Sequence, residues 1–412
     1  MSKDSNVRLA QSGDEQGAGV GREVFKLLKN NVRSYAMYIV LVLIFIIFNF
    51  ATNGDFLSAG NISNLINQTG YVAVLAIGMT LILIIRHIDL AVGFVAGFTG
   101  AIAAKLMFDY NLNPWLAVLV AILLGALVGL YQGTLVAYVG VPAFVTTLAG
   151  QFIFKGVLLL LTMGTGTIIV KSTTFNNIAN GYIPDIPASL IGEHGLHILT
   201  IAIGVIGVAL VIISQLKVRV KKQKYGFKVV SLPIFLLGLV VAAAVIMVII
   251  FLLAGQNGIP WTAVIVGVLL LIYNFMLNKT ALGRYIYGIG GNPEAAELSG
   301  VNVRKVTLLC FISMGTLAAI AGVLYTSRLQ SATTNAGIGF ELDAIASSYI
   351  GGVAVSGGVG KVTNTIVGAL IIMSLTSGFL LLQVDIAYQY IAKGIIFIIA
   401  VAFDILSRKK RA

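Results

Sequence analysis

Twelve long apolar runs restrict what this chain can fold into. A helix that crosses about 30 Å of hydrocarbon needs about 20 mostly apolar residues, because every backbone polar group must be paired inside it. Only 10% of the 412 residues are charged, whereas a water-soluble domain carries about 25%. The sequence therefore predicts an all-α, polytopic membrane protein. The expected spans lie near 35–51, 70–86, 89–107, 115–138, 143–162, 197–214, 229–254, 261–277, 306–327, 341–356, 362–382 and 388–406.

The run at 341–356 differs from the others. It is short, it begins with Glu341 and Asp343, and it contains the pair Gly351 and Gly352. Glycine-interrupted apolar segments are typical of discontinuous membrane helices. We therefore expect a broken or re-entrant element there.

The distribution of Lys and Arg predicts the orientation of the chain, because cytoplasmic loops retain positive charge. With the N-terminus inside and twelve crossings, 22 of the 27 cations lie on the cytoplasmic side. Omitting 341–356 would put the basic C-terminus outside. We therefore expect a cytoplasmic tail at 1–34, a transmembrane domain at 35–406 and a second cytoplasmic tail at 407–412.

Several functional classes are excluded by composition. The longest predicted segment outside the membrane, 163–196, is too short for a catalytic domain, so we expect no catalytic residues. One cysteine and three histidines leave little for a metal site. The net charge of +12 could suggest a nucleic-acid ligand, but its cations are dispersed between apolar runs, so we expect none.

Charge inside the predicted spans is sparse. Ion-coupled transporters usually place acids or histidines near the membrane midplane, whereas the 15 acidic residues here lie mostly at span ends. We expect the two cations within spans, Lys155 and Lys393, to extend toward the interface or to bind carbonyls at helix breaks. The pattern favours a neutral polar solute and an energy source outside this chain.

The segment 279–305, between two spans, carries a clear pattern of helix caps. Asn292 is a good N-cap, Pro293 suits the first helical position, and Gly300 suits the position after the last turn. These residues predict a short helix over 292–300 on the cytoplasmic side. Such a helix is marginal alone in water, so we expect it to pack on a surface, and a motor protein could bind it. An ordinary surface turn is the alternative.

Four stretches of the sequence carry a resemblance: TALGRYIYGIGGNPEAAELSGVNV at 280–303, RHIDLAVG at 86–93, GVPAFVTTL at 140–148 and ELDAIASSYIGGVAVSGGVG at 341–360. They resemble stretches of the ribose- and xylose-type sugar permeases of ATP-binding-cassette importers. They occur in family order and, with the spans between them, cover most of residues 60–406. With its three spans between 197 and 277, the chain has a longer form that resembles the xylose and multiple-monosaccharide permeases.

The resemblance implies a fold like that of the cobalamin-type permeases and a homodimer in a bacterial cell (inner) membrane. It implies two cytoplasmic ATPases, which use ATP and Mg, and an extracytoplasmic binding protein that delivers a monosaccharide of the xylose, arabinose, galactose or glucose class. This chain itself would bind no cofactor. By the same resemblance the ATPase docks on Gly283, Arg284, Asn292, Pro293, Glu294, Ala295, Ala296, Leu298, Ser299 and Gly300.

The chain departs from the ribose-type pattern in two places. It has three spans between 197 and 277 where ribose-type permeases have one, with a basic loop at 217–228. It also has Arg86-His87 where the family usually has two glycines before Ile-Asp-Leu. An added pair of spans preserves the orientation of everything that follows it.

Polar residues around the broken spans are candidates for the translocation path, although they could equally be caps or loop residues. Two alternative functions stay open: an ion-coupled secondary sugar transporter, and an importer permease for nucleosides or branched-chain amino acids. The path candidates are Asp89, Asn335, Glu341, Asp343, Ser347, Ser348 and Ser356.

Overall fold

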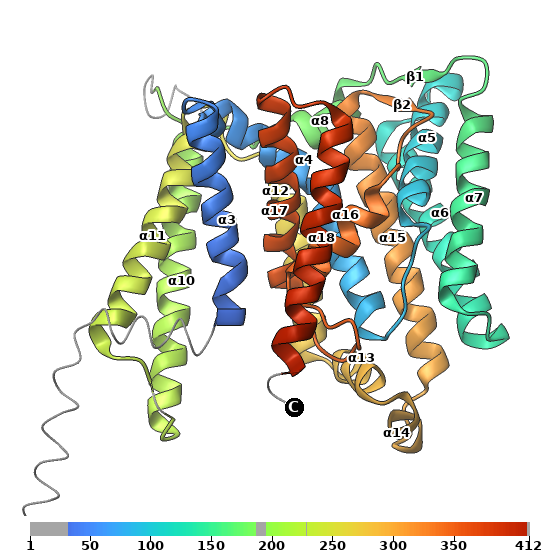
Figure 1. Cartoon of the computed structure of the whole chain (residues 1–412). Coiled ribbons are helices and arrows are strands. Elements are labelled where there is room, and N and C mark those ends of the chain that lie inside the picture. The colour runs from blue at the N-terminus through green and yellow to red at the C-terminus, as the bar shows by residue number, and fades with distance from the viewer. Residues whose placement is uncertain (1–31, 187–194, 228, 410–412) are drawn as a thin grey trace, which may run out of the picture. The chain divides into compact units, whose positions relative to one another are not determined.

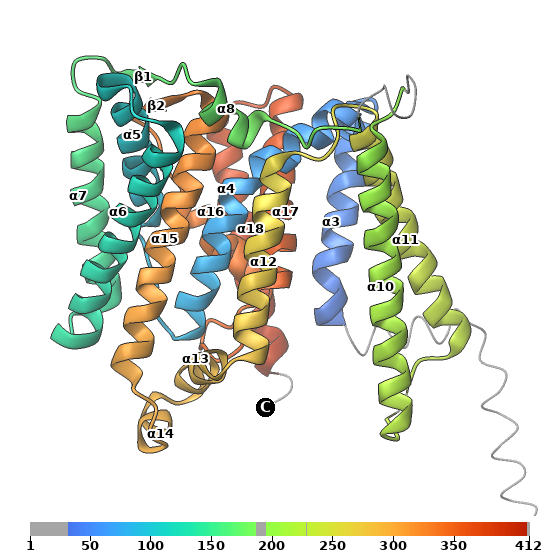
Figure 2. The same ribbon diagram turned by 180° about the vertical axis from the view of Figure 1, so that it is seen from behind.

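Helices account for all twelve predicted spans. The computed structural model describes residues 32–186, 195–227 and 229–409. Most of the predicted N-terminal tail (1–31), part of the segment predicted at 163–196 (187–194), Lys228, and residues 410–412 of the C-terminal tail lie outside the described residues. The helices are α3 (Val32–Ala51), α4 (Ala59–Ile84), α5 (Val92–Tyr110), α6 (Pro114–Thr134), α7 (Ala143–Leu161), α10 (Ile198–Lys224), α11 (Leu232–Ala254), α12 (Trp261–Lys279), α15 (Val303–Leu329), α16 (Phe340–Ile350), α17 (Val362–Leu381) and α18 (Ile386–Lys409) (Figures 1 and 2).

Within the described residues, nine of these helices are long and apolar enough to cross a membrane. Those that fall short are α3 and α18, whose apolar described portions are shorter, and α16. The remaining elements are the single turns η1 (Asp55–Leu57) and η2 (Leu135–Val139), the strands β1 (Thr167–Ile169) and β2 (Ser331–Thr333), and the helices α8 (Thr173–Asn180), α13 (Ala281–Gly291) and α14 (Pro293–Leu298).

The chain divides into two compact units. The larger comprises Val40–Pro184 and Gln256–Ala412, and the smaller contains Asp185–Gly255. In the larger unit the core is built around α4, whose side chains from Gly70 to Ile84 are all buried. Because this part of α4 is surrounded by other helices, it has no face left for lipid.

Glycines allow the helices around α4 to approach closely. A methyl group on Gly125 of α6 would lie 2.3 Å from the carbonyl oxygen of Gly315 on α15, and one on Gly322 would lie 2.1 Å from that of Ala96 on α5. These distances are too short for any side chain, as in the small-residue interfaces of membrane helices. The glycines of α5, α6 and α15 therefore serve helix packing.

The broken element predicted at 341–356 is confirmed. Helix α16 has 11 residues and is about 17 Å long, roughly half the hydrocarbon thickness. It follows β2, which pairs antiparallel with β1 at one end of the larger unit, and it leads to Gly358, which donates to Ile84 at the opposite end, where α4 terminates. This segment therefore passes from one end of the unit to the other, with turns on both sides of a short helix (Figure 1).

The smaller unit is a helical hairpin of α10 and α11, packed at Gly204, where a methyl group would lie 2.6 Å from the Ile250 side chain. Within the larger unit, Ile183 donates to the Ile259 carbonyl and Trp261 donates to the Gly181 carbonyl. The two ends of the segment that contains the extra helix pair are thus held together within the larger unit.

Several boundaries differ from the prediction, among them the start of α4, which lies at Ala59 rather than near residue 70. Helix α10 continues through most of the basic loop expected at 217–228, because Lys, Arg and Gln are good helix formers that extend it to Lys224. The segment at 163–196 contains β1 and α8, and α18 runs to Lys409, into the expected C-terminal tail.

Candidate functional site

Helix α14 has the caps that its sequence predicts. The Asn292 side chain accepts a hydrogen bond from the Ala295 amide at 3.0 Å. At the other end Gly300, with φ +84°, donates to Glu297 at 2.9 Å and Val301 donates to Ala296 at 3.0 Å. These two bonds form a Schellman motif. The helix has only six residues, so its caps are needed to hold it.

The surface of α14 is almost entirely open. Leu298 is 91% exposed, more than any other large apolar side chain in the described residues, and Glu294 and Glu297 are exposed as well. Isolated apolar side chains on a surface are ordinary, but this one stands on a short helix capped at both ends. Helix α14 therefore forms a small exposed knob, by which we mean its surface with the apolar side chain of Leu298 and the acidic side chains of Glu294 and Glu297.

The predicted coupling residues divide between two helices. Gly283 and Ala296 are buried and Pro293 is partly buried, so these three attach the segment to the bundle. Those that face outward are Arg284, Asn292, Glu294, Ala295, Leu298, Ser299 and Gly300.

Helix α13 was not predicted, although its sequence carried a signal. Ile286, Ile289 and Gly290 are buried and recur at the spacing of an amphipathic helix. A methyl group on Gly290 would lie 2.0 Å from the Ile84 carbonyl oxygen and 2.5 Å from the Gly358 nitrogen. Tyr287 donates to Gly360 at 2.8 Å. Helix α13 is therefore packed against the end of α4 and the loop that follows α16.

Arg86 closes this junction. It adopts the left-handed conformation, with φ +65°, and its guanidinium donates to the last carbonyls of α13, from Nε to Gly290 at 2.7 Å and from Nη2 to Gly291. A positive charge at a helix C-terminus is favourable. Three segments thus meet at one point, which we call the Arg86 junction: the 84–86 end of α4, the C-terminus of α13, and residues 357–360.

The segment from Arg86 to Ala91 and the segment before α16 form two breaks, and the second packs against the first turns of α5 inside the larger unit. A methyl group on Gly93, in the first turn of α5, would lie 2.2 Å from the Gly337 carbonyl oxygen, and Gly337 itself has φ +94°. One on Gly97 would lie 2.4 Å from the Ala336 carbonyl oxygen. Backbone packs directly on backbone here, and the Glu341 carboxylate lies beside Gly93.

Two carboxylates lie beside these breaks. Asp89 is 2% exposed, and one of its oxygens accepts from the Ala91 amide at 2.9 Å. Glu341 is also buried, and its Oε2 has no hydrogen-bond partner among the described residues. A buried carboxyl oxygen without a partner is costly, which marks Glu341 as a group that a ligand, water or neighbouring subunit could satisfy.

A cavity of about 400 Å³ opens beside the N-terminus of α16. Its inner wall holds three packed aromatic rings: the Phe340 ring lies 4.7 Å from that of Tyr71 and 4.8 Å from that of Tyr325. On α18, Lys393 donates to both oxygens of Asp343, at 3.1 and 3.2 Å. The cavity therefore combines aromatic faces with a charge pair, and the Gln389 side chain also lines it.

The two cations within spans have partners that sequence reasoning did not identify. Lys393 pairs with Asp343 rather than with carbonyls. Lys155 lies 5.7 Å from the centre of the Phe94 ring. Each partner is distant in sequence, so no local signal pointed to it.

The other predicted path residues are placed differently. Asn335 is exposed, in the turn between β2 and α16. Ser347 and Ser348 are fully buried, and their hydroxyls donate to Asp343 and Ala344 in the same helix, which favours a packing role. Ser356 is exposed in the tight turn close to the Arg86 junction. The structure thus brings Asp89, Asn335 and Glu341 to the breaks and Asp343 to the cavity.

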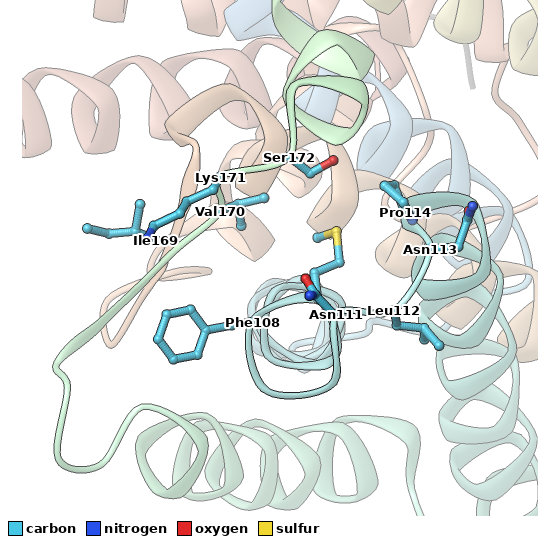
Figure 3. Close-up of a pocket in the computed structure, with 10 residues that line it drawn as sticks. Phe108, Asn111, Leu112, Asn113, Pro114, Ile169, Val170, Lys171 and Ser172 are labelled. Carbon is cyan, nitrogen blue, oxygen red and sulfur yellow. The ribbon is translucent and has the colours of Figure 1, made fainter.

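The end of the larger unit opposite α14 carries a depression of about 490 Å³. It is lined from two sides, by the turn between α5 and α6 and by the segment that follows β1 (Figure 3). The polar side chains in this lining are Asn111, Asn113, Lys171 and Ser172. Metal ligation finds no support in the described residues, where no group of three His, Cys, Asp or Glu residues could hold an ion.

Comparisons with known proteins agree with this architecture. The family described as "Branched-chain amino acid transport system / permease component" matches residues 61–401. The xylose transport system permease protein of Haemophilus influenzae is 39% identical over 387 residues, which is 94% of this chain and 100% of that protein. Its counterpart in Escherichia coli (strain K12) is 36% identical, over 92% of this chain and 93% of that protein. The ribose import permease protein of Haemophilus influenzae is 33% identical, over 90% of this chain and 92% of that protein. No solved structure matches.

Proposed function

Since the chain belongs to the family of the branched-chain amino acid transport system permease component, and permeases for xylose and ribose resemble it over nearly its whole length, we propose that it moves a monosaccharide of the xylose class. It is the membrane-spanning permease subunit of an ATP-binding-cassette sugar importer. An ATPase and a substrate-binding protein are its partners. As a transport permease it is a multi-pass membrane protein.

The proposal extends to the assembly. Two copies of this chain form a homodimer, with two ATPases on the cytoplasmic side, which use ATP and Mg, and one binding protein on the other. Both termini are cytoplasmic, because the α13–α14 segment and most of the cations then share one side. The depression between the α5–α6 turn and β1 then faces the binding protein, and Lys171 and the two asparagines are available to it.

The observation that carries the coupling role is the exposure of Leu298 on a helix capped at both ends. The ATPase docks on this knob and its two glutamates. When ATP closes the ATPases, α14 moves with them, and α13 transmits the motion to the Arg86 junction. From there two covalent connections lead inward: residues 87–91 to α5, and residues 351–357 back to α16.

The sugar path follows from where these connections end. Both reach the breaks at Gly93 and Gly337, beside Glu341 and the cavity. Aromatic faces suit the apolar faces of a pyranose, and Asp343 and Gln389 suit its hydroxyls. Small displacements at the junction therefore change the access of a neutral sugar to this cavity.

The test is transport by the purified permease, reconstituted with its ATPase and binding protein in vesicles. ATP-dependent uptake of radiolabelled xylose, competed by ribose, arabinose, galactose or glucose but not by leucine or a nucleoside, supports the proposal. Competition by leucine or a nucleoside alone would indicate instead that the chain is an importer permease for branched-chain amino acids or nucleosides. Uptake that persists without ATP and stops with an uncoupler would indicate an ion-coupled transporter.

The coupling role has its own test. Leu298→Asp should reduce binding of the ATPase and ATP-dependent uptake, with the permease still present in the membrane. Leu298→Met is the matched control: it keeps an apolar side chain of similar size at the same position and should leave binding nearly unchanged. Normal uptake by Leu298→Asp would show that α14 is not the docking element.

A further inference from the structure

The basic end of α10 is a feature that the transport function does not explain. Residues 217–224 contain Lys217, Arg219, Lys221, Lys222 and Lys224, and no Asp or Glu occurs between Glu193 and Glu294. These cations belong to the extra hairpin, which is absent from the ribose-type pattern. Their charge therefore has no acidic partner within the hairpin.

The cations separate onto different faces of the helix. Lys217, Lys221 and Lys224 follow one another at intervals of four and three residues, which places them along one face. Arg219 points away from that face: its Nη1 donates to the Val230 carbonyl at 2.7 Å, and its guanidinium lies 4.7 Å from the Phe235 ring. Arg219 thus ties α10 to the start of α11.

The lysine face borders a shallow groove of about 490 Å³. Its other lining residues are Ile213, Leu216, Val220 and Tyr225. All of these side chains are exposed in the hairpin. The groove therefore has an apolar floor along the helix and an ammonium group at each turn.

The length of α10 places this groove at the membrane surface. Its 27 residues span about 40 Å, whereas the hydrocarbon is about 30 Å thick. If the helix enters the hydrocarbon near Ile198, Lys217 lies at the opposite boundary. Lys221 and Lys224 then lie about 6 and 10 Å further out, at the depth of the lipid headgroups.

We propose that the face formed by Lys217, Lys221 and Lys224 binds the phosphate headgroup of an anionic phospholipid, with an acyl chain along Ile213 and Leu216. The residues along the helix match the parts of such a lipid: apolar residues lie at the depth of the acyl chains, and lysines lie at the depth of the negatively charged headgroup. This lipid anchors the extra hairpin. The inference is independent of the sugar, since it concerns residues outside the coupling segment and the cavity.

The experiment is native mass spectrometry of the purified full-length permease in detergent, titrated with palmitoyl-oleoyl phosphatidylglycerol or phosphatidylcholine. Each lysine near an anionic surface contributes about a fivefold gain in affinity. The variant K217Q/K221Q/K224Q should therefore lose on the order of a hundredfold in phosphatidylglycerol affinity, with phosphatidylcholine binding unchanged. Glutamine keeps helix propensity, and an unchanged circular dichroism spectrum verifies the fold.

A matched pair of single variants makes the test local. Lys221→Gln removes one charge from the groove, and Lys222→Gln removes one charge from the adjacent position, which does not line the groove. Lys221→Gln should weaken phosphatidylglycerol binding about fivefold and Lys222→Gln clearly less. Equal effects of the two would overturn the proposal, because the binding would then reflect net charge alone.

Two further outcomes would also overturn it. Displacement of the lipid by millimolar inorganic phosphate would indicate a site for a free anion. Unchanged lipid binding in the triple variant, accompanied by loss of ATPase binding, would indicate a protein partner.

Discussion

Gly290→Ala tests whether the Arg86 junction transmits motion from α13 to the rest of the bundle. The added methyl group would lie 2.0 Å from the Ile84 carbonyl oxygen and 2.5 Å from the Gly358 nitrogen. Both atoms belong to the backbone, so neither can rotate away. To restore ordinary contact α13 must move by about 1 Å, since nonbonded carbon and oxygen or nitrogen atoms need more than about 3 Å.

The size of the effect follows from two opposing terms. Overpacking of this kind costs about 1–3 kcal/mol, and the gain in helix propensity from glycine to alanine returns about 1 kcal/mol. Because both clashes are with backbone, the upper half of the range applies, and the net cost is about 1–2 kcal/mol. A bias of that size changes the ratio of two conformations by a factor of about 5–30.

The assay is ATP-dependent sugar uptake in vesicles together with ATP hydrolysis by the assembled transporter. Uptake per ATP hydrolysed should fall about 5–30-fold, because the motor remains docked while its motion is poorly transmitted. Gly288→Ala is the matched control: it lies in the same helix, and a methyl group there meets nothing within 4 Å. Equal uptake per ATP in the two variants would refute the role of the junction.

Three further predictions concern caps and charges. Asn292→Ala removes the N-cap of α14 and should destabilise that helix by about 1 kcal/mol, seen as faster amide hydrogen exchange in 295–300 and weaker ATPase binding; unchanged exchange would contradict it. Lys393→Met or Asp343→Asn alone leaves its partner without a counter-ion and should lower the midpoint of thermal unfolding, whereas the double variant should recover most of the loss; additive losses would contradict the pairing. A hydrogen bond from the Leu199 backbone amide is the main reason why the pKa of Asp185 lies below its usual range; burial raises this pKa, and the amides of Ile186 and Ile198 lower it further. The hydrogen bonds between Asp185 and the start of α10 are therefore kept above the usual carboxyl pKa and lost as pH falls through the depressed pKa. Amide exchange at Leu199 should rise across that acidic range in the wild type, and in Asp185→Asn it should be independent of pH after correction for intrinsic exchange.

The helices and the caps of α14 were predictable because their causes are local. Twenty apolar residues must form a helix in hydrocarbon, so each run revealed a span whatever its neighbours. Asn292, Pro293 and Gly300 act on bonds within a few residues of themselves, so the sequence pattern contained the geometry.

The contacts that build the site were not predictable because they join distant residues. Arg86 reaches Gly290, and Lys393 reaches Asp343. A single sequence shows that Arg86 and Lys393 are charged, but it does not show which distant residue accepts their hydrogen bonds. Ser347 and Ser348 were selected as polar residues near a break, yet helical geometry turns their hydroxyls back to the preceding turn.

The hydrogen bond between Ile183 and Ile259 implies that the extra hairpin could be deleted without disturbing the rest of the chain. These residues are joined by a hydrogen bond of 3.0 Å, so the ends of the 75 residues from 184 to 258 lie side by side. A two-residue turn of the kind that closes an antiparallel hairpin could replace them. A genetic excision at this point would return a ten-span chain, and a reporter domain could be grafted there without altering the order of the remaining helices.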